Sequence, residues 1–181
     1  MKELSLHILD IVQNSLTAGA QNICVEIKEN IDDNFFKIKI ADDGEGMNKK
    51  EKNESVDPFV TSRQTRDVGL GLPLFKETAE ACAGFLEVNS KPGEGTEITA
   101  YFEHNHIDRP PLGDMAGTIT TIIALNPELN LSYKHIYDNR EFIFDSKNVK
   151  EKLNGVAINN NSVLTWLDEY LAENITKLRS D

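Results

Sequence analysis

The chain has 181 residues, a length that suits one full domain with a remainder but is too short for two large independent cores. Its 39% hydrophobic and 27% charged residues are ordinary for a globular protein, which argues against collagen-like, largely disordered and coiled-coil structures. With 19 Lys and Arg against 30 Asp and Glu, the net charge is -11, so nucleic acid and anionic membrane surfaces repel the chain. We therefore expect neither nucleic acid nor a membrane as a partner.

The sequence shows no signal for export or membrane insertion. It has no run of about 18 apolar residues, and no signal-peptide core follows Met1. Cys24 and Cys82 are only two thiols, too few for a disulfide scaffold and without the spacing of a zinc site. We therefore expect a protein of the reducing cytoplasm.

The first half of the chain is predicted to alternate helices with pairs of strands. Apolar residues recur at helical spacing over 4–18, and Gly19 stops that amphipathic helix. Alternating apolar residues at 23–27 and 36–40 flank a polar turn, which is a hairpin pattern with one buried face. The polar stretch 48–68 is expected to be irregular.

A second unit of the same kind follows. A helix is predicted over 70–83 with Gly84 as its C-terminal cap, and residues 86–88 and 98–102 give another strand pair. The order of helix, two strands, loop, helix and two strands favours an α+β fold with helices on one face of a largely antiparallel sheet. This first domain is assigned to residues 1–103.

The rest of the chain is predicted to form a linker and a small α+β appendage. Residues 104–114 are rich in proline and typical of an extended connector. Residues 115–125 suit a helix or a β-branched strand, and a helix is favoured because Asp114 and Asn126-Pro127 bound the segment. The elements predicted for the appendage, residues 115–181, are this segment, a hairpin over 131–135 and 141–144, a short helix capped by Asp145 or Ser146, and an amphipathic helix over 162–178.

Three glycine-containing loops carry the candidate chemistry. Asp42 follows a strand and begins Asp42-x-Gly44-x-Gly46, where glycines let the backbone approach a flat ligand. The Asp42 carboxylate can accept a hydrogen bond from an exocyclic amine, and adenine offers one. Gly69-Leu70-Gly71-Leu72 opens a helix, whose N-terminus favours a phosphate. Gly93-Glu94-Gly95-Thr96 is a third turn at which glycines would let the backbone come close to a ligand.

Each of these signals has a plain structural explanation when it stands alone. A Gly-x-Gly pair is usually only a turn, and a polar stripe on a helix is usually only a solvated face. Asn14 lies on such a stripe of the first helix, where its amide oxygen could also bind Mg²⁺. Competing phosphate motifs are absent, because no Gly-x-x-x-x-Gly-Lys occurs and Leu74 replaces the third glycine of a dinucleotide fingerprint after Gly69-x-Gly71.

Taken in order, these motifs resemble the ATP-binding domain shared by histidine kinases, Hsp90-type chaperones, type II topoisomerases, MutL-like repair proteins and anti-sigma-factor serine kinases. The resemblance covers about residues 4–102. The segments that resemble the family's N box, first glycine box, phenylalanine box and two further glycine boxes are residues 10–20, 42–46, 57–61, 69–72 and 93–96. Four or five boxes in order make this match specific.

The resemblance implies a two-layer sandwich of the Bergerat type, in which a mixed sheet backs a few helices. ATP would lie between the helices under a lid, here residues 60–68. By position, Asn14 would ligate Mg²⁺ and Asp42 would bind the adenine amine, while Arg63 and Arg66 could reach the phosphates. The nucleotide contacts that the boxes imply are Asn14, Asp42, Gly44, Gly46, Phe59, Thr61, Arg63, Gly69, Leu70, Gly71, Leu72 and Thr96.

Two departures from the family pattern bear on activity. Asp10 stands where hydrolysing and serine-phosphorylating members carry Glu and where histidine kinases usually carry Asn, and Asp is one methylene shorter than Glu. Only a handful of residues precede the N box, so we expect no phosphoacceptor helix pair of the histidine-kinase kind. His7, one helical turn before Asp10, is interpreted as a structural residue rather than a phosphate acceptor.

The resemblance therefore implies a histidine-kinase-like protein that binds ATP and Mg²⁺. The leading hypothesis is phosphoryl transfer to an unidentified protein partner in trans, with Asp10 as the catalytic residue and the lid closing over the phosphates. The alternatives are a nucleotide-gated protein-binding module without chemistry and a slow ATPase. A homodimer is a possible assembly. The sequence identifies neither the phosphoacceptor nor the role of the tail.

Overall fold

The computed structural model describes residues 2–59 and 71–180, which form one sheet with helices against it. The strands are β1 (Asn22–Asn30), β2 (Phe35–Asp42), β3 (Phe85–Lys91), β4 (Gly95–Glu103), β5 (Asn130–Tyr137) and β6 (Arg140–Asp145). The helices are α1 (Leu4–Thr17), α2 (Lys49–Ser55), α3 (Gly71–Ala81), α4 (Met115–Leu125), α5 (Ser146–Lys152) and α6 (Asn161–Arg179).

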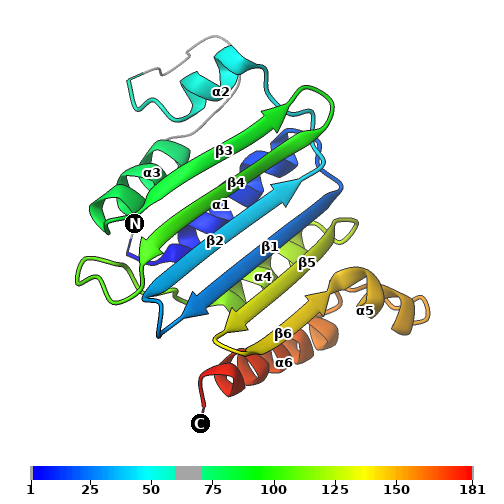
Figure 1. Cartoon of the computed structure of the whole chain (residues 1–181). Helices are drawn as coiled ribbons and strands as arrows, with labels where there is room; N and C mark the ends of the chain where they lie inside the picture. The colour runs from blue at the N-terminus through cyan, green and yellow to red at the C-terminus, as the bar shows by residue number, and fades with distance from the viewer. Residues whose placement is uncertain (1, 60–70, 181) are drawn as a thin grey trace.

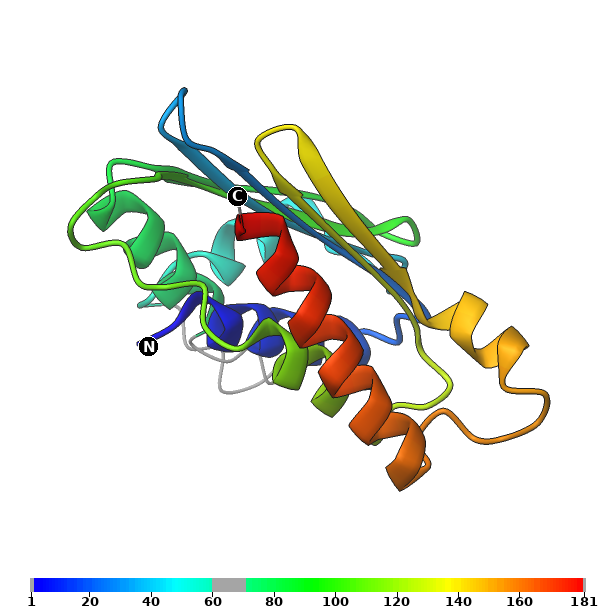
Figure 2. The same cartoon turned by 90° about the horizontal axis from the view of Figure 1, so that it is seen from below.

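The molecule has two layers (Figures 1 and 2). Figure 2 shows the sheet above and α1, α3, α4 and α6 below it, so that one face of the sheet carries no helix of the described residues. Along β1 and β2, every second side chain is buried against the helices, because successive residues of a strand point to opposite faces. The predicted α+β sandwich with a mixed sheet is confirmed. Across residues 2–59 and 71–180, no helix combines the length and the apolar character needed to cross a membrane.

The sheet runs in the order β3-β4-β2-β1-β5-β6. All neighbouring strands are antiparallel except β1 and β5, which run parallel with Asn22 opposite Asn130. The elements after the linker therefore extend the sheet of the N-terminal part, and buried side chains from both parts form one hydrophobic core. The division into residues 1–103, 104–114 and 115–181 stays a prediction.

Helix α1 lies in the centre of the helical layer. Leu4, Ile8, Ile11 and Val12 are at most 1% exposed, and their helical spacing is the pattern that predicted this element. Gly19 then takes a φ of 77°, a left-handed conformation that glycine adopts without steric cost, and its N–H bonds a carbonyl of the last turn. The helix therefore ends where the sequence indicated.

The prediction of an irregular stretch after residue 48 is wrong in its first part, because residues 49–55 form α2. Asn48 caps this helix by accepting the backbone N–H groups of Lys50 and Glu51 at 2.9 and 3.0 Å. The Glu51 carboxylate accepts the backbone N–H of Asn48 in return, at 2.8 Å. This reciprocal pair is a capping box, and its Asn-x-x-Glu pattern stands in the sequence.

Gly84 is predicted as the C-terminal cap of α3, and its backbone N–H does bond the Ala79 carbonyl in the last turn of that helix, at 2.9 Å. The left-handed conformation is taken by Ala83, with a φ of 54°, and not by Gly84. Glycine is required at position 84 for a second reason, because a Cβ there would collide with the backbone of Tyr101 on β4. The chain can therefore turn from α3 into β3 only if residue 84 has no side chain.

A buried carboxylate ties the C-terminal elements to the sheet. Glu29 of β1 is 2% exposed, and its Oε1 accepts hydrogen bonds from His135 at 2.8 Å and from Arg179, at the end of α6, at 2.6 Å. Its Oε2 lies 3.0 Å from Nε2 of His104 in the linker. Burial alone would raise the pKa of Glu29, but the hydrogen bonds from His135, Arg179 and His104 outweigh it and lower that pKa to about 2.

Candidate functional site

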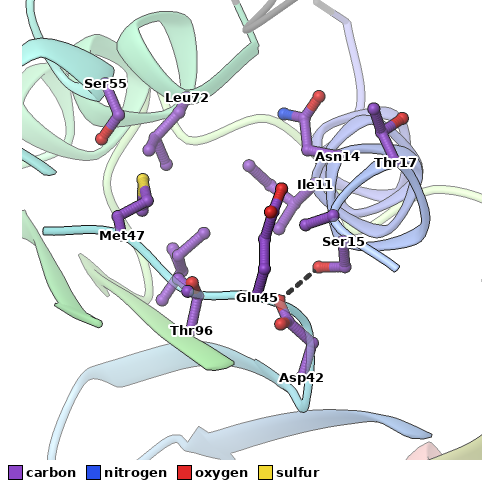
Figure 3. Close-up of a pocket in the computed structure, with 13 residues that line it drawn as sticks. Ile11, Asn14, Ser15, Thr17, Asp42, Glu45, Met47, Ser55, Leu72 and Thr96 are labelled. Atoms are coloured by element: carbon purple, nitrogen blue, oxygen red, sulfur yellow. Dashed lines mark hydrogen bonds between the residues drawn. The ribbon is translucent and has the colours of Figure 1, made fainter. Parts of the chain in front are cut away.

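A cavity lies between α1, the β2–α2 loop, β4 and the start of α3 (Figure 3). It holds about 800 Å³ of empty space, its open mouth included, which is within the range of small-ligand pockets. Its apolar walls are Ile11, Met47, Leu72 and Ile98. Its polar lining includes Asn14, Ser15, Asp42, Glu45 and Thr96. A mostly apolar wall with a few polar groups suits a flat, partly polar ligand such as a nucleobase.

Asp42 stands at the end of β2 with both carboxylate oxygens held by the fold. Ser15 of α1 donates its hydroxyl to Oδ2 at 2.6 Å, and the Gly44 N–H donates to Oδ1 at 2.9 Å. Figure 3 shows the bond from Ser15 at the base of the cavity. Each carboxylate oxygen keeps a further lone-pair direction, so Asp42 can accept a hydrogen bond from an amine of a ligand.

The glycines of the first and last boxes allow two loops to pack against each other. Gly46 takes a φ of 66°, and a Cβ there would collide with the Lys91 carbonyl. Gly95 takes a φ of 98°, and a Cβ there would collide with the Asp42 carbonyl. Both positions are in the left-handed region, which favours glycine. The glycines therefore shape the floor of the cavity and fix the place of Asp42.

Asn14 lines the cavity from α1 and is the predicted metal ligand. Figure 3 shows its carboxamide on the far side of the cavity from Asp42. Within residues 2–59 and 71–180, no group hydrogen-bonds this carboxamide, so its oxygen is available to a cation. Mg²⁺ takes few protein ligands and completes its shell with phosphate oxygens and water, and a single amide oxygen fits that requirement.

Asp10, the predicted catalytic residue, lies one helical turn before Asn14 on α1, so both side chains project from the same side of the helix. Its carboxylate packs against Gly71, the first residue of α3, where a Cβ would collide with it. The N-terminus of a helix carries a partial positive charge that stabilises an anion there. Asp10 does not line the cavity itself, but it lies one turn of α1 from Asn14, which does.

His7 is buried between α1 and α3, as expected of a structural residue. Its ring stacks on Phe75 with centroids 4.9 Å apart, and its Nε2 lies 3.3 Å from the Thr78 hydroxyl. The residue is 0% exposed, and burial lowers the pKa of its imidazole to about 4. An acceptor of phosphate must reach the nucleotide, and this ring faces the interior.

The remaining predicted contacts divide into two groups. Phe59 is 92% exposed and does not line the cavity, and Gly44 supports Asp42 from beside it. Thr61, Arg63, Arg66, Gly69 and Leu70 lie outside the described residues, as does the predicted lid over 60–68. The roles of these residues toward a nucleotide stay predictions.

Some lining residues stand in or next to the boxes but were not predicted as contacts. Ser15 follows Asn14 directly, but its bond to Asp42 joins positions 27 apart in the chain, which only the tertiary fold brings together. Glu45 lies between the two glycines of its box, and Figure 3 shows its carboxylate directed into the cavity. Met47 contributes an apolar wall from the same loop. Local patterns do not distinguish such residues from ordinary loop positions.

Comparisons with known proteins agree with this geometry. The family model described as histidine kinase-, DNA gyrase B-, and HSP90-like ATPase matches residues 2–106. The non-motile and phage-resistance protein of Caulobacter vibrioides is 28% identical over 115 residues, which are 60% of this chain and 14% of that protein. Sporulation kinase D of Bacillus subtilis is 30% identical over 92 residues, 51% of this chain and 18% of that kinase.

The likeness to these relatives is thus confined to a small part of their length. A solved structure, the N-terminal domain of a DNA repair protein, superposes with a TM-score of 0.54 at 14% identity and covers 79% of this chain and 52% of that one. At this identity the structural match shows the fold alone. Because the family model covers more than half of the chain, the chain belongs to the histidine kinase-, DNA gyrase B-, and HSP90-like ATPase family.

Proposed function

We propose that this chain binds Mg-ATP in the cavity of Figure 3 and transfers the terminal phosphate to a protein partner. The observation that carries the proposal is the Asp42 carboxylate, held by Ser15 and by the Gly44 N–H at the base of an apolar cavity. A fixed acceptor between apolar walls suits the 6-amino edge of adenine and disfavours the 6-oxo edge of guanine.

The phosphates would lie at the Asn14 side of the cavity. The Asp42 carboxylate lies at the base of the cavity (Figure 3), and phosphate groups are repelled by a carboxylate. The amide oxygen of Asn14 can hold Mg²⁺, and the start of α3 offers the N-terminal end of a helix to an anion. When bound, Mg²⁺ supplies charge neutralisation for the phosphates.

Asp10 lies one turn of α1 from Asn14 and packs against the start of α3, so its carboxylate is suited to proton transfer on this side of the cavity. In the proposed step, a side chain of the partner forms a bond to the terminal phosphorus while the bond between that phosphorus and the bridging oxygen breaks. ADP leaves with the electron pair, and the Asp10 carboxylate takes the proton of the attacking group. Positioning and charge stabilisation account for most of the rate in such reactions.

A second function is favoured by one observation. Asp10 packs against Gly71 and does not line the cavity, so it could serve to hold α1 and α3 together and take no part in chemistry. The chain would then be a nucleotide-gated module that engages its partner only when ATP is bound. The two functions differ in the fate of the terminal phosphate.

The Asp10→Asn variant separates these functions. It removes a negative charge near the terminal phosphate, so ATP affinity should stay unchanged or improve slightly. If Asp10 accepts the proton, label transfer from radioactive ATP to proteins of an added cell extract should slow by about 10²–10⁴. Glu80→Gln, which also neutralises a carboxylate but at an exposed position of α3, is the matched control and should transfer at the wild-type rate.

Equal label transfer by wild type and Asp10→Asn would remove Asp10 from the chemistry. An ATP-dependent association with extract proteins without any transferred label would contradict the kinase and support the nucleotide-gated module.

A further inference from the structure

A serine behind the cavity joins two segments that line it. Ser90 of β3 does not line the cavity, but its hydroxyl oxygen accepts the backbone N–H of Met47 at 2.8 Å. The same oxygen lies 3.0 Å from the Gly95 carbonyl and 2.8 Å from the Thr96 hydroxyl. Met47 and Thr96 both line the cavity. Ser90 is therefore in contact with two of its walls at once.

The register of the sheet places Ser90 in one row with Asp42, the main hydrogen-bond acceptor of the site. Ser90 is directly opposite Thr96 across β3 and β4, and Thr96 is directly opposite Asp42 across β4 and β2. Residues directly opposite each other in antiparallel strands point to the same face of the sheet. The row Ser90, Thr96 and Asp42 thus lies on the helix-covered face, with Thr96 next to the carboxylate.

The number of hydroxyl protons on Ser90 and Thr96 determines whether Thr96 turns its proton or its lone pairs toward the cavity. A serine hydroxyl has one proton and two lone pairs, and a carbonyl can only accept. If Ser90 donates to the Gly95 carbonyl, Thr96 must donate to Ser90, and all three contacts of Ser90 are hydrogen bonds. If Ser90 donates to Thr96, the Gly95 contact is lost. The first arrangement has one more hydrogen bond, and it turns the lone pairs of Thr96 toward the cavity.

We propose that Ser90 is a positioning residue that fixes Thr96 as a hydrogen-bond acceptor and so strengthens the choice of a 6-amino purine over a 6-oxo purine. This inference rests on the proposed nucleotide function of the same cavity. With Thr96 held in this way, two neighbouring acceptors, Asp42 and Thr96, face the base edge. An amino group satisfies acceptors, whereas an oxo group has no proton to offer them.

The test compares the affinities of Mg-ATP and Mg-ITP, which differ at the 6-position of the base. In Ser90→Ala, the Thr96 proton is free to turn toward an oxo group, so the ratio of ATP to ITP affinity should fall about fivefold, the value of one ordinary hydrogen bond. Ser90→Thr keeps the hydroxyl and should keep the ratio. Asn89→Ala, at an exposed position of the same strand, is the matched control.

A second pair of variants, both carrying Thr96→Val, isolates the role of Thr96. In Thr96→Val the hydroxyl is gone, so adding Ser90→Ala should leave the ATP to ITP ratio where Thr96→Val alone puts it. If Ser90→Ala merely loosened the β2–α2 loop, it would weaken the binding of both nucleotides equally and leave the ATP to ITP ratio unchanged. That result would overturn the inference but not the proposed function. A wild-type chain that binds neither nucleotide would overturn both.

The hydrogen bond from Met47 can be examined without any nucleotide. If Ser90 holds this N–H, the Met47 amide should exchange with solvent faster in ligand-free Ser90→Ala than in wild type or Ser90→Thr. Unchanged exchange would contradict the arrangement of bonds on which the inference is built.

Discussion

Asn14 and Asp42 are the two residues whose roles differ most clearly within the cavity. Asp42 is fixed by two donors, whereas the Asn14 carboxamide has no partner within the described residues. A side chain that is already bonded is suited to read a ligand with a fixed geometry. A side chain without partners is suited to ligate an ion that arrives with the ligand.

This difference predicts a metal-dependent effect of Asn14→Ala. The variant should lose more affinity for Mg-ATP than for metal-free ADP, because only the first ligand uses the amide oxygen. Titration calorimetry of both ligands measures the two losses, with Gln13→Ala, an exposed neighbour on α1, as the control. Equal losses for the two ligands would show that Asn14 supports the helix and not the metal.

At the level of single residues, the sequence could predict those to which a motif assigns a role of their own. Asn14, Asp42 and Thr96 were expected at the site, and all three line the cavity. Ser15 and Ser90 could not be predicted in the same way, because their partners lie on other elements and are set by strand register and helix packing.

Among the elements, the packing of α1 on α3 carries a pH-sensitive group. His7 is fully buried there, and its pKa of about 4 lies below the ordinary value of 6.5. The unfolded chain therefore takes up the proton first as the pH falls. The contribution of a neutral His7 to stability is complete above pH 6.5 and is lost as the pH falls from 6.5 to about 4.

We expect His7→Phe, which keeps an aromatic ring against Phe75, to remove this part of the pH dependence. Urea unfolding of wild type and variant between pH 7 and pH 4 measures it, and wild type should lose more stability over that interval than the variant does. Parallel pH profiles would mean that His7 is protonated equally easily in the folded and unfolded chains.

Elements with strong local signals were predictable, and those with weak ones were not. Helix α4 has the predicted bounds of 115–125, with Asp114 as the N-cap that accepts the Gly117 N–H at 2.8 Å. Helix α2 has no apolar residue, so it gives no periodic signal, and its capping box was the feature that could have revealed it.

At the scale of the whole molecule, the parallel pairing of β1 with β5 decides how the C-terminal elements are placed. Local sequence patterns predict strands but not which strands pair, and β1 and β5 lie about a hundred residues apart along the chain. The buried Glu29 supports this pairing, because it accepts hydrogen bonds from β5, from the linker and from the end of α6.

Glu29→Gln should destabilise the protein at pH 7 by about 2–4 kcal/mol, because Arg179 and the two histidines lose a buried anionic partner. The carboxylate has a pKa of about 2, below its ordinary 4.5, so its stabilising effect is complete above pH 4.5 and is lost as the pH falls from 4.5 to about 2. The gap between wild type and variant in urea unfolding should close over that interval.

Glu26→Gln is the matched control, because Glu26 lies on the same strand but on the open face, paired with Lys37 at 2.8 Å. Such a partly exposed pair contributes about 0–1 kcal/mol. If Glu29→Gln is no more destabilising than Glu26→Gln, the buried network does not hold the C-terminal elements.

Calorimetric titration of the wild-type chain and of Asp42→Ala with Mg-ATP and Mg-GTP tests the central claim most directly. The account predicts that wild type binds Mg-ATP more tightly than Mg-GTP. It also predicts that Asp42→Ala weakens Mg-ATP binding by about ten- to a hundredfold, because a hydrogen bond to a charged group is lost. A wild-type chain that binds no adenine nucleotide, or that binds both nucleotides equally and keeps its affinity in Asp42→Ala, would contradict it.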